Sequence, residues 1–530
     1  MNVHARPDES EFAALLQQQE GKSLLRFIAC GSVDHGKSTL LGRLLFESQQ
    51  IFEDQLDALA TDSRKFGTLG ADLDFSLLLD GLAAEREQNI TIDIAHRFFT
   101  TARRKFIVID APGHEEYTAN MATGASLADL AVVLVAADEG LTRQTRRHLA
   151  ILSMLGLRHV ALAVNKMDRV GWSEATFRTI EASFCDLAKD LGIAHVLCIP
   201  LAAKSGDNVI ARSRHMPWYQ GPALLEYLES VELDREAQFR PFRMPVQWVS
   251  RPNSDFRGYS GLIAGGEARV GMTVKILPSG RTSHIARIAT FDGDLVSAAA
   301  GRSVTITLAD EIDASRGDVI ADAGQPPAVI ERTRARVFWM KDRALEPGQN
   351  YLLKLATSTA MASVEPGFSV IDLDTRKPIA VESIAQNEVG TCTLKLDRPI
   401  AADRYADCRD TGSFVLIDPE TYDTVGMGCV EDVSSPRRRG WLTGWTRKRT
   451  KAVKGKLTRW SETHARSLAK AVSWRATGSL DTFVVTFVIT GSTKLAGSVA
   501  ITEVMTKILI YYGHERLWAW IPWGKRQAVP

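Results

Sequence analysis

Residues suited to binding the phosphates of a nucleotide lie close to the N-terminus. Residues 31–38 fit the pattern G-x-x-x-x-G-K-S. The apolar residues 24–30 before them predict a buried strand, and residues 39–45 predict a helix. In that context backbone N–H groups point at phosphates, Lys37 reaches the β- and γ-phosphates, and the Ser38 hydroxyl binds Mg²⁺. A Gly-rich turn with no ligand is the alternative, and the motifs further along the chain argue against it.

A second segment supplies a carboxylate and a histidine. Residues 107–110 predict a strand that ends in Asp110, where such proteins hold Mg²⁺ through water. Gly113 follows in a turn and can present its N–H to a γ-phosphate with no side chain in the way. His114 comes next, and we expect it to orient the attacking water. A histidine with only a surface or packing role is the alternative.

A third segment predicts selectivity for guanine. Residues 160–164 form an apolar strand, followed by the sequence Asn-Lys-Met-Asp. The Asp168 carboxylate can accept hydrogen bonds from N1–H and N2–H₂ of guanine, a donor pair that adenine lacks. Residues 199–206 are expected to supply a backbone amide to the guanine O6.

Thr91 is expected to join the Mg²⁺ shell only while a γ-phosphate is present, which would make its loop a switch. An ordinary strand threonine is the alternative. For catalysis we predict His114, Lys37 and Gly113, and for the metal Ser38, Thr91 and, through water, Asp110. The residues predicted to bind GTP are Gly31, Ser32, Val33, Asp34, His35, Gly36, Lys37, Ser38, Thr39, Asp110, Ala111, Pro112, Gly113, His114, Asn165, Lys166, Met167, Asp168, Ala202 and Ala203.

The pattern of apolar segments divides the chain. Residues 24–232 alternate apolar strands with helical stretches, which is typical of a doubly wound α/β domain. Residues 240–328 and 330–432 show short alternating strands and turn signals, which predict two β-barrels. The 530 residues allow three or four domains. Residues 1–23 are read as an N-terminal extension without an apolar signal-peptide core.

The six cysteines occur singly and without C-x-x-C, which argues against a zinc site or a disulfide framework and favours a reducing cytosol. The net charge of +1 hides a split. Residues 436–530 hold 18 Lys/Arg and 4 Asp/Glu, whereas residues 1–435 hold 46 and 59. The C-terminal part is therefore expected to be a separate module with its own kind of partner.

The C-terminal module combines basic residues, tryptophans and two apolar segments. Seven of the eleven tryptophans follow residue 440. Residues 437–465 are read as a basic linker, and basic and Trp residues flanking apolar helices suit a membrane interface. Glu503 and Lys507 interrupt the second apolar segment, so three alternatives stay open. They are a membrane hairpin, an interfacial helix pair, and a basic tail that binds nucleic acid.

Four stretches outside the GTPase motifs carry a family resemblance: residues 79–88, 216–222, 246–259 and 290–294. With the motifs above, residues 24–432 resemble the large, GTPase subunits of bacterial two-subunit sulfate adenylyltransferases, a branch of the elongation-factor-like GTPases. The resemblance implies that GTP hydrolysis here drives the uphill formation of adenosine 5′-phosphosulfate and pyrophosphate from ATP and sulfate on a separate small subunit. It implies GTP and Mg²⁺ as cofactors.

Two other functions remain as alternatives: a translation-factor GTPase, and a membrane-tethered regulatory GTPase without sulfurylase activity. Residues 1–435 carry a net negative charge, whereas a surface that binds RNA should be basic, so no nucleic acid is expected as a partner. Three positions depart from the family pattern. Asn89 stands where Gly is usual, Ala111 stands where Thr is usual, and Ala202 stands where Ser is usual. None removes a phosphate, Mg²⁺ or guanine contact, although they leave the hydrolysis rate open.

Residues 466–524 resemble a small bacterial domain of unknown function with two predicted transmembrane helices. The matching residues include 470–483 and 503–518. This resemblance favours the membrane alternative. We expect a cytoplasmic protein tethered to the inner face of the inner membrane by residues 466–524.

Overall fold

The computed structural model describes residues 22–48, 63, 75, 91, 93–233, 240–253, 256–373, 375 and 377–433. The chain divides into two compact units, Met1–Arg439 and Gly440–Pro530. All described residues belong to the first unit. The predicted N-terminal extension, most of the loop around Thr91 and the predicted membrane hairpin lie outside the described residues.

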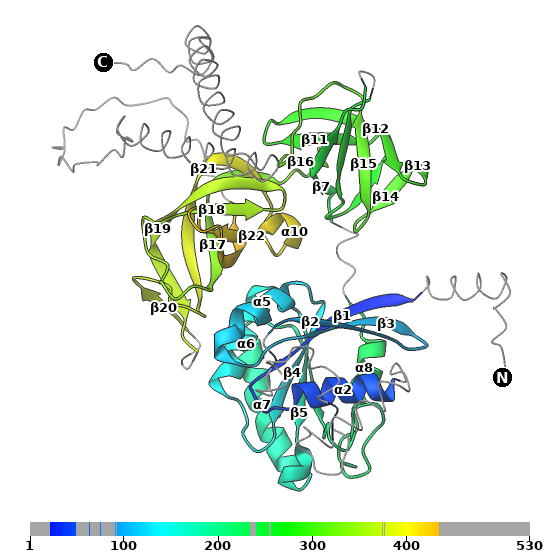
Figure 1. Ribbon diagram of the computed structural model, residues 1–530, viewed down its shortest axis with the longest axis vertical. Helices are drawn as coiled ribbons and strands as arrows, with labels where there is room; N and C mark the ends of the chain where they lie inside the picture. Colours follow the sequence, from blue (N-terminus) through cyan, green and yellow to red (C-terminus); the bar gives the residue numbers. More distant parts are fainter. Residues whose placement is uncertain are drawn as a thin grey trace, which may run out of the picture. The chain divides into compact units, whose positions relative to one another are not determined.

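A six-stranded sheet with helices on both faces forms the first domain (Figure 1). The strand order is β2-β3-β1-β4-β5-β6, and all neighbours run parallel except β2 and β3. The strands are β1 (Ser23–Gly31), β2 (Ala95–Thr100), β3 (Arg104–Asp110), β4 (Leu130–Ala136), β5 (His159–Asn165) and β6 (His195–Pro200). The predicted doubly wound α/β domain is confirmed.

The helices of this domain bury apolar residues against both faces of the sheet. All seven residues of β4 are buried, as expected for a central parallel strand. Leu40 and Leu44 of α2 pack on one face, and Leu149 and Leu152 of α6 pack on the other. The helices are α2 (Lys37–Glu47), α5 (Thr118–Ser126), α6 (Arg143–Met154), α7 (Glu174–Asp190) and α8 (Leu224–Ser230), with 3₁₀ turns η2 (Glu115–Tyr117) and η3 (Met167–Val170).

The second domain is an antiparallel β structure with the path β7-β16-β11-β12-β15-β9-β8. The predicted turn at Asp292-Gly293 joins β12 to β13, where Thr290 pairs with Gly293. The strands are β7 (Arg243–Pro245), β8 (Trp248–Ser250), β9 (Gly258–Leu262), β10 (Glu267–Arg269), β11 (Thr273–Leu277), β12 (Arg281–Thr290), β13 (Gly293–Leu295), β14 (Ser297–Ala299), β15 (Ser303–Leu308) and β16 (Val319–Asp322).

The third domain is a closed barrel. Its strands follow the order β18-β22-β23-β17-β21-β19, and pairing between β18 and β19 closes the ring. The elements are β17 (Ala328–Trp339), β18 (Asn350–Leu355), β19 (Ser358–Ile371), β20 (Pro378–Val381), β21 (Val389–Ala402), α10 (Arg409–Gly412), β22 (Ser413–Ile417) and β23 (Thr424–Asp432). The prediction of β-barrel domains after the α/β domain is therefore confirmed.

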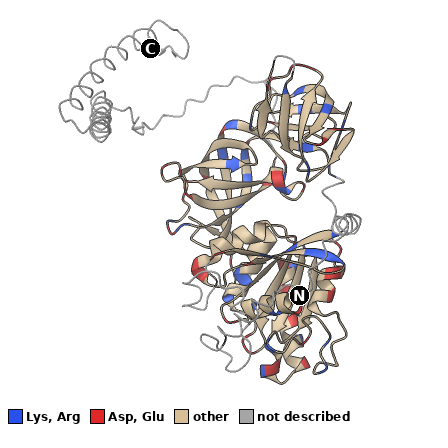
Figure 2. Ribbon diagram, turned by 45° about the vertical axis from the view of Figure 1, so that its right-hand side comes forward, with Lys and Arg blue, Asp and Glu red and all other residues tan. Residues whose placement is uncertain are grey.

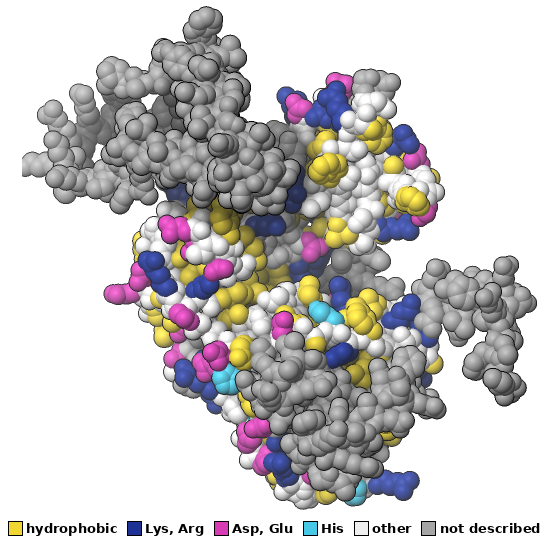
Figure 3. All heavy atoms as spheres, viewed as in Figure 1, with side chains coloured by type: hydrophobic (Ala, Val, Ile, Leu, Met, Phe, Trp, Pro, Cys, Tyr) yellow, Lys and Arg dark blue, Asp and Glu magenta, His cyan; other side chains and the backbone are white. Residues whose placement is uncertain are grey.

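Charged side chains of both signs are interspersed over the described domains (Figure 2). The second domain also exposes large apolar side chains, among them Trp248, Leu262 and Phe291. Figure 3 shows hydrophobic side chains (yellow) on the surface of this domain. Within the described residues, no helix combines the length and the apolar character that a membrane crossing requires.

Candidate guanine nucleotide site

The predicted motifs converge at one edge of the parallel sheet. They follow β1, β3, β5 and β6, and carboxyl ends of parallel strands lie at the same edge. The next two strands along the chain, β2 and β3, lie on one side of β1, and β4 lies on the other side. The strand order therefore reverses at β1. Ligands of open α/β sheets bind in the crevice that forms at this point.

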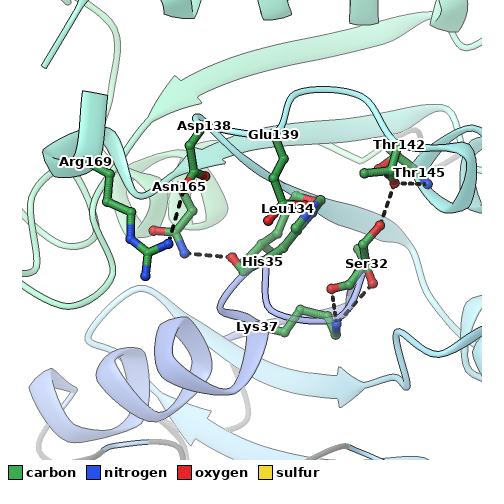
Figure 4. Close-up of polar contacts among 11 residues, drawn as sticks. Ser32, His35, Lys37, Leu134, Asp138, Glu139, Thr142, Thr145, Asn165 and Arg169 are labelled. Atoms are coloured by element: carbon green, nitrogen blue, oxygen red, sulfur yellow. Dashed lines mark hydrogen bonds and ion pairs between the residues drawn. The ribbon is translucent and has the colours of Figure 1, made fainter. Parts of the chain in front are cut away.

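The phosphate-binding loop wraps around the Lys37 ammonium. Gly36 takes a left-handed conformation (φ 83°) just before α2 begins. Lys37 Nζ donates to the Gly31 carbonyl at 3.0 Å and to the Ser32 carbonyl at 2.8 Å (Figure 4). Burial lowers the pKa of Lys37, while the Asp110 carboxylate acts in the opposite direction. A buried cation at a helix N-terminus is suited to binding a polyphosphate.

Gly113 lies directly against this loop. A Cβ added at residue 113 would collide with Lys37 Nζ and would lie 2.7 Å from the Gly31 carbonyl oxygen. The segment after β3 can therefore approach the lysine only with glycine at this position. The backbone of Gly113 is thus close to where Lys37 would hold the terminal phosphates.

The residues predicted to hold Mg²⁺ supply hard oxygen donors. Ser38 lies in the first turn of α2, and Asp110 ends β3 with 2 % of its surface exposed. One hydroxyl and one carboxylate are the donor types that Mg²⁺ takes when most of its shell is water and phosphate. The donor set fits the ion. Thr91 is described, but residues 76–90 and 92 lie outside the described residues, so the switch remains a prediction.

His114 is half exposed at the start of η2. Its Nδ1 accepts a hydrogen bond from the Glu116 N–H at 3.3 Å, and its ring lies 5.9 Å from the Tyr117 ring. Asn387 of the third domain donates from Nδ2 to the Glu115 carbonyl at 3.1 Å. Arg147 of α6 pairs with the Glu115 carboxylate at 2.8 Å, and this hydrogen bond lowers the pKa of Glu115. The residue next to His114 is thus held from two sides.

Asn165 joins two of the predicted loops. Its Nδ2 donates to the His35 carbonyl at 2.8 Å, and its Oδ1 accepts from the Ala203 N–H at 2.9 Å. Ala203 belongs to residues 199–206, from which a backbone amide is expected to reach the guanine O6, and its N–H is engaged by Asn165 in this structure. Asp168 lies in the first turn of η3 with its side chain exposed. It is accessible to the edge of a base.

Some contacts of the site were not predicted. The Ser32 and Thr142 hydroxyls lie 2.5 Å apart, and Thr142 caps the N-terminus of α6 (Figure 4). The His35 ring is fully buried, and its Nδ1 donates to the Leu134 carbonyl at 3.0 Å. A threonine before an amphipathic helix is a recognisable cap signal, but its contact with Ser32 spans 110 residues and has no local signal.

The two described departures from the family pattern are buried. Ala111 and Ala202 have no exposed surface. The Ala202 N–H donates to the Asp207 carbonyl at 3.2 Å, and its carbonyl accepts from the Gly206 N–H at 2.9 Å. Backbone groups make these contacts, so they do not depend on a serine hydroxyl at residue 202. Asn89 lies outside the described residues.

Comparison with known protein families gives three matches along the chain. Residues 22–234 match the elongation factor Tu GTP binding domain. Residues 332–431 match a family described as GTP-eEF1A C-terminal domain-like. Residues 468–519 match a family described as a predicted membrane protein.

Curated proteins similar to this chain carry one recurring name. Sulfate adenylyltransferase subunit 1 of Methylorubrum extorquens is 54 % identical over 433 residues, covering 82 % of this chain and 92 % of that protein. The subunit 1 of Aeromonas hydrophila is 50 % identical over 432 residues, covering 81 % and 91 %. The subunit 1 of Vibrio cholerae is 51 % identical over 418 residues, covering 79 % and 88 %.

Proposed function

Because this chain belongs to the sulfate adenylyltransferase subunit 1 family and is a GTP-hydrolysing subunit of sulfate assimilation, we propose that the site described above performs the hydrolysis. Its reaction is GTP plus water to GDP and phosphate. The reaction that it drives, on a small partner subunit, joins sulfate to the adenylyl group of ATP and releases pyrophosphate.

The observation that supports this site best is the packing of Gly113 against the phosphate-binding loop. A side chain at residue 113 would collide with Lys37 Nζ. A γ-phosphate held by Lys37 would lie within reach of the Gly113 N–H, so the segment that ends at His114 would respond to the presence of that phosphate. A GDP molecule lacks this contact.

The proposed chemistry relies on positioning and on charge. Lys37 and the N-terminus of α2 stabilise negative charge on the β- and γ-phosphates as the bridging bond breaks. His114 orients the water whose oxygen attacks the γ-phosphorus. Ser38, Thr91 and, through water, Asp110 would hold Mg²⁺, which would supply positive charge next to the phosphates. Asp168 selects guanine, and Asn165 keeps the guanine loop next to the phosphate-binding loop.

The small subunit is the natural test partner. The chain and the small sulfurylase subunit are co-expressed, and sulfate-dependent pyrophosphate release is measured with and without GTP. We expect GTP to stimulate release, and we expect Lys37→Ala to abolish that stimulation because the phosphates lose their buried cation. Lys354→Ala, an exposed lysine on β18, serves as the matched control and should behave as wild type. Pyrophosphate release that does not respond to GTP would contradict the proposal.

A membrane tether is a second, independent part of the proposal. The match of residues 468–519 to a predicted membrane protein family supports it, as do the basic and Trp residues around that segment. We propose that this segment holds the GTPase at the cytoplasmic face of the inner membrane.

Cell fractionation tests the tether. Full-length protein should sediment with membranes, and a chain ending at residue 435 should remain in the supernatant while keeping its GTP binding. Carbonate extraction then distinguishes a spanning hairpin, which stays in the pellet, from an interfacial helix pair, which is released. Equal distribution of the two chains between the fractions would overturn the tether and leave the GTPase proposal intact.

A further inference from the structure

An arginine-lined cavity lies at the sheet edge opposite the nucleotide loops. Its volume is about 580 Å³, which is within the range of small-molecule sites. Residues before β4 and β5 line it from the α/β domain, and β17, β23 and the segment after β21 line it from the third domain. Both domains belong to one compact unit. None of the predicted nucleotide-binding residues takes part in this lining.

The lining carries a surplus of positive charge. Five arginines face two carboxylates, Asp129 and Glu431. The arginines are Arg158, Arg240, Arg336, Arg404 and Arg409. Glu431 pairs with Arg336 at 2.7 Å and Asp129 pairs with Arg26 at 3.2 Å. Arg158 and Arg240 also have polar or electrostatic partners of their own, so the surplus is one of net charge in the lining. Two further carboxylates lie nearby. Asp407 lies 3.3 Å from Arg404, with more than half of each side chain exposed. Asp410 interacts electrostatically with Arg240 and Arg409.

The arginines come from separate parts of the chain. Arg158 precedes β5, Arg240 precedes the second domain, and Arg404 and Arg409 follow β21. Guanidinium groups from different elements can bind different oxygens of one ligand, and arginine pairs with phosphoryl and sulfuryl oxygens in a two-pronged geometry. The same lining includes the apolar side chains of Met154, Leu157 and Ile193, which would contact a less polar part of the ligand.

We propose that this cavity binds a small polyanion with two linked phosphoryl or sulfuryl groups, either pyrophosphate itself or a nucleoside diphosphate. Such an anion matches the net positive charge of the lining, and the cavity is large enough to admit either one. The proposal goes beyond GTP binding, because the guanine nucleotide site lies at the other edge of the sheet.

Helix α6 connects this cavity with the nucleotide site. At its N-terminus, the Thr142 hydroxyl contacts Ser32 of the phosphate-binding loop at 2.5 Å. At its C-terminus, Tyr405 Oη donates to the Leu155 carbonyl at 2.7 Å, and Arg409 donates to the Gly156 carbonyl. A ligand that holds the third domain against the end of α6 would therefore alter GTP hydrolysis. This second consequence rests on the proposed function.

Calorimetry on the full chain tests the binding site. The protein is first saturated with GDP and Mg²⁺, with a fluorescent GDP analogue in a parallel sample to show that the nucleotide stays bound. Pyrophosphate and ADP, both with matched Mg²⁺, are then titrated separately. We expect one binding event at a ratio of one per chain. Equal affinity for the two probes means that the diphosphate group alone is recognised, and tighter binding of ADP means that the ligand is a nucleotide.

Two exposed arginines from different domains provide the variants. Arg158→Gln and Arg404→Gln should each weaken binding of the probe about tenfold or more, because each removes a charge-assisted hydrogen bond. Arg332→Gln, which removes an exposed arginine paired with Glu365 on the same barrel, is the control and should bind as wild type. No heat from either probe in wild type, or equal binding by all variants, would overturn the proposal.

GTP binding distinguishes failure of this inference from failure of the proposed function. Arg158→Gln and Arg404→Gln should bind GTP as wild type does, and pyrophosphate should change the GTP hydrolysis rate of wild type but not of Arg404→Gln. Normal GTP binding without probe binding would refute only the polyanion site. Absence of GTP binding would refute the proposed function.

Discussion

Asn165 Nδ2 donates a hydrogen bond to the His35 carbonyl over 2.8 Å, which ties the guanine-specific loop to the phosphate-binding loop. The other end of the same amide accepts from the Ala203 N–H at 2.9 Å. One buried side chain therefore fixes the distance between the loops that would hold the two ends of GTP.

Asn165→Ala should weaken GTP binding and destabilise the domain. The change leaves a buried carbonyl and a buried N–H without their partner, and each such loss costs about 1–3 kcal/mol. Calorimetry with GTP and thermal unfolding would measure the two effects. Asn350→Ala, at an exposed position on β18, is the control for both. Unchanged GTP affinity in Asn165→Ala would show that the tie is not needed for binding.

Asp168→Asn should change which base is bound. The carboxylate accepts from two guanine donors, whereas the amide presents a donor that suits the 2-oxo group of xanthine. Affinity for GTP should fall about a hundredfold or more, and xanthosine triphosphate should gain what GTP loses. Competition between the two nucleotides for a fluorescent GDP analogue gives both values. A variant that still prefers GTP would show that Asp168 does not read the base.

His114→Ala should bind GTP as wild type does and lose most of its hydrolysis. A residue that orients the attacking water contributes roughly 10²–10⁴ to the rate. Single-turnover hydrolysis of bound GTP isolates the chemical step from nucleotide release. The half-exposed position of His114 makes misfolding of the variant a minor concern. Hydrolysis at the normal rate would remove His114 from the mechanism.

Asn387→Gly should slow hydrolysis without weakening GTP binding. Asn387 has a φ of 62°, which glycine adopts without strain, so the variant loses the hydrogen bond to the Glu115 carbonyl and keeps the backbone. We expect kcat to fall roughly tenfold, because the segment that carries His114 loses one of its supports. If Asn387→Ala lowers both kcat and thermal stability while Asn387→Gly lowers neither, the cause is backbone strain in the alanine variant and not loss of the hydrogen bond to Glu115.

His148 should make the α/β domain sensitive to acid. The His148 side chain is fully buried in α6, and its Nε2 lies 2.9 Å from the amide nitrogen of Gln144. Burial lowers the pKa of His148 to about 3, with further repulsion from Lys37, Arg147 and His35. The unfolded chain takes up the proton near pH 6.5 and the folded chain does not, so stability is lost as the pH falls from about 6.5 towards 3.

Urea unfolding at pH 7.5 and pH 5.5 measures this effect. The His148 contribution should lower the free energy of unfolding by about 1.4 kcal/mol between these two pH values. His148→Gln has no titrating ring and should lose less stability over the same interval, by about that difference. The same pH dependence in both proteins would mean that His148 is charged in the folded state.

The sequence predicted the parts of the site that depend on local pattern. The strand that ends at Asp110 follows from its apolar run, and the helix predicted over residues 39–45 is present, although it begins two residues earlier at Lys37. The glycine at residue 113 is required by its close approach to the phosphate-binding loop. The barrels were predictable for the same reason, because alternating strands and turns repeat along residues 240–432.

Contacts between distant segments could not be predicted in this way. Asn387 and Glu115 lie 272 residues apart, and nothing in either local sequence specifies the hydrogen bond between them. The arginines of the polyanion cavity likewise become neighbours only through the packing of the third domain on α6. An exposed arginine in a sequence gives no sign of which other arginines it will face.

Calorimetry of the purified full chain with GTP and with ATP, each in the presence of Mg²⁺, tests the central claim most directly. Binding of one GTP per chain, with ATP weaker by about a hundredfold or more, is the result that the Asp168 and Lys37 geometry predicts. Equal affinity for ATP, or no heat with GTP, would contradict it.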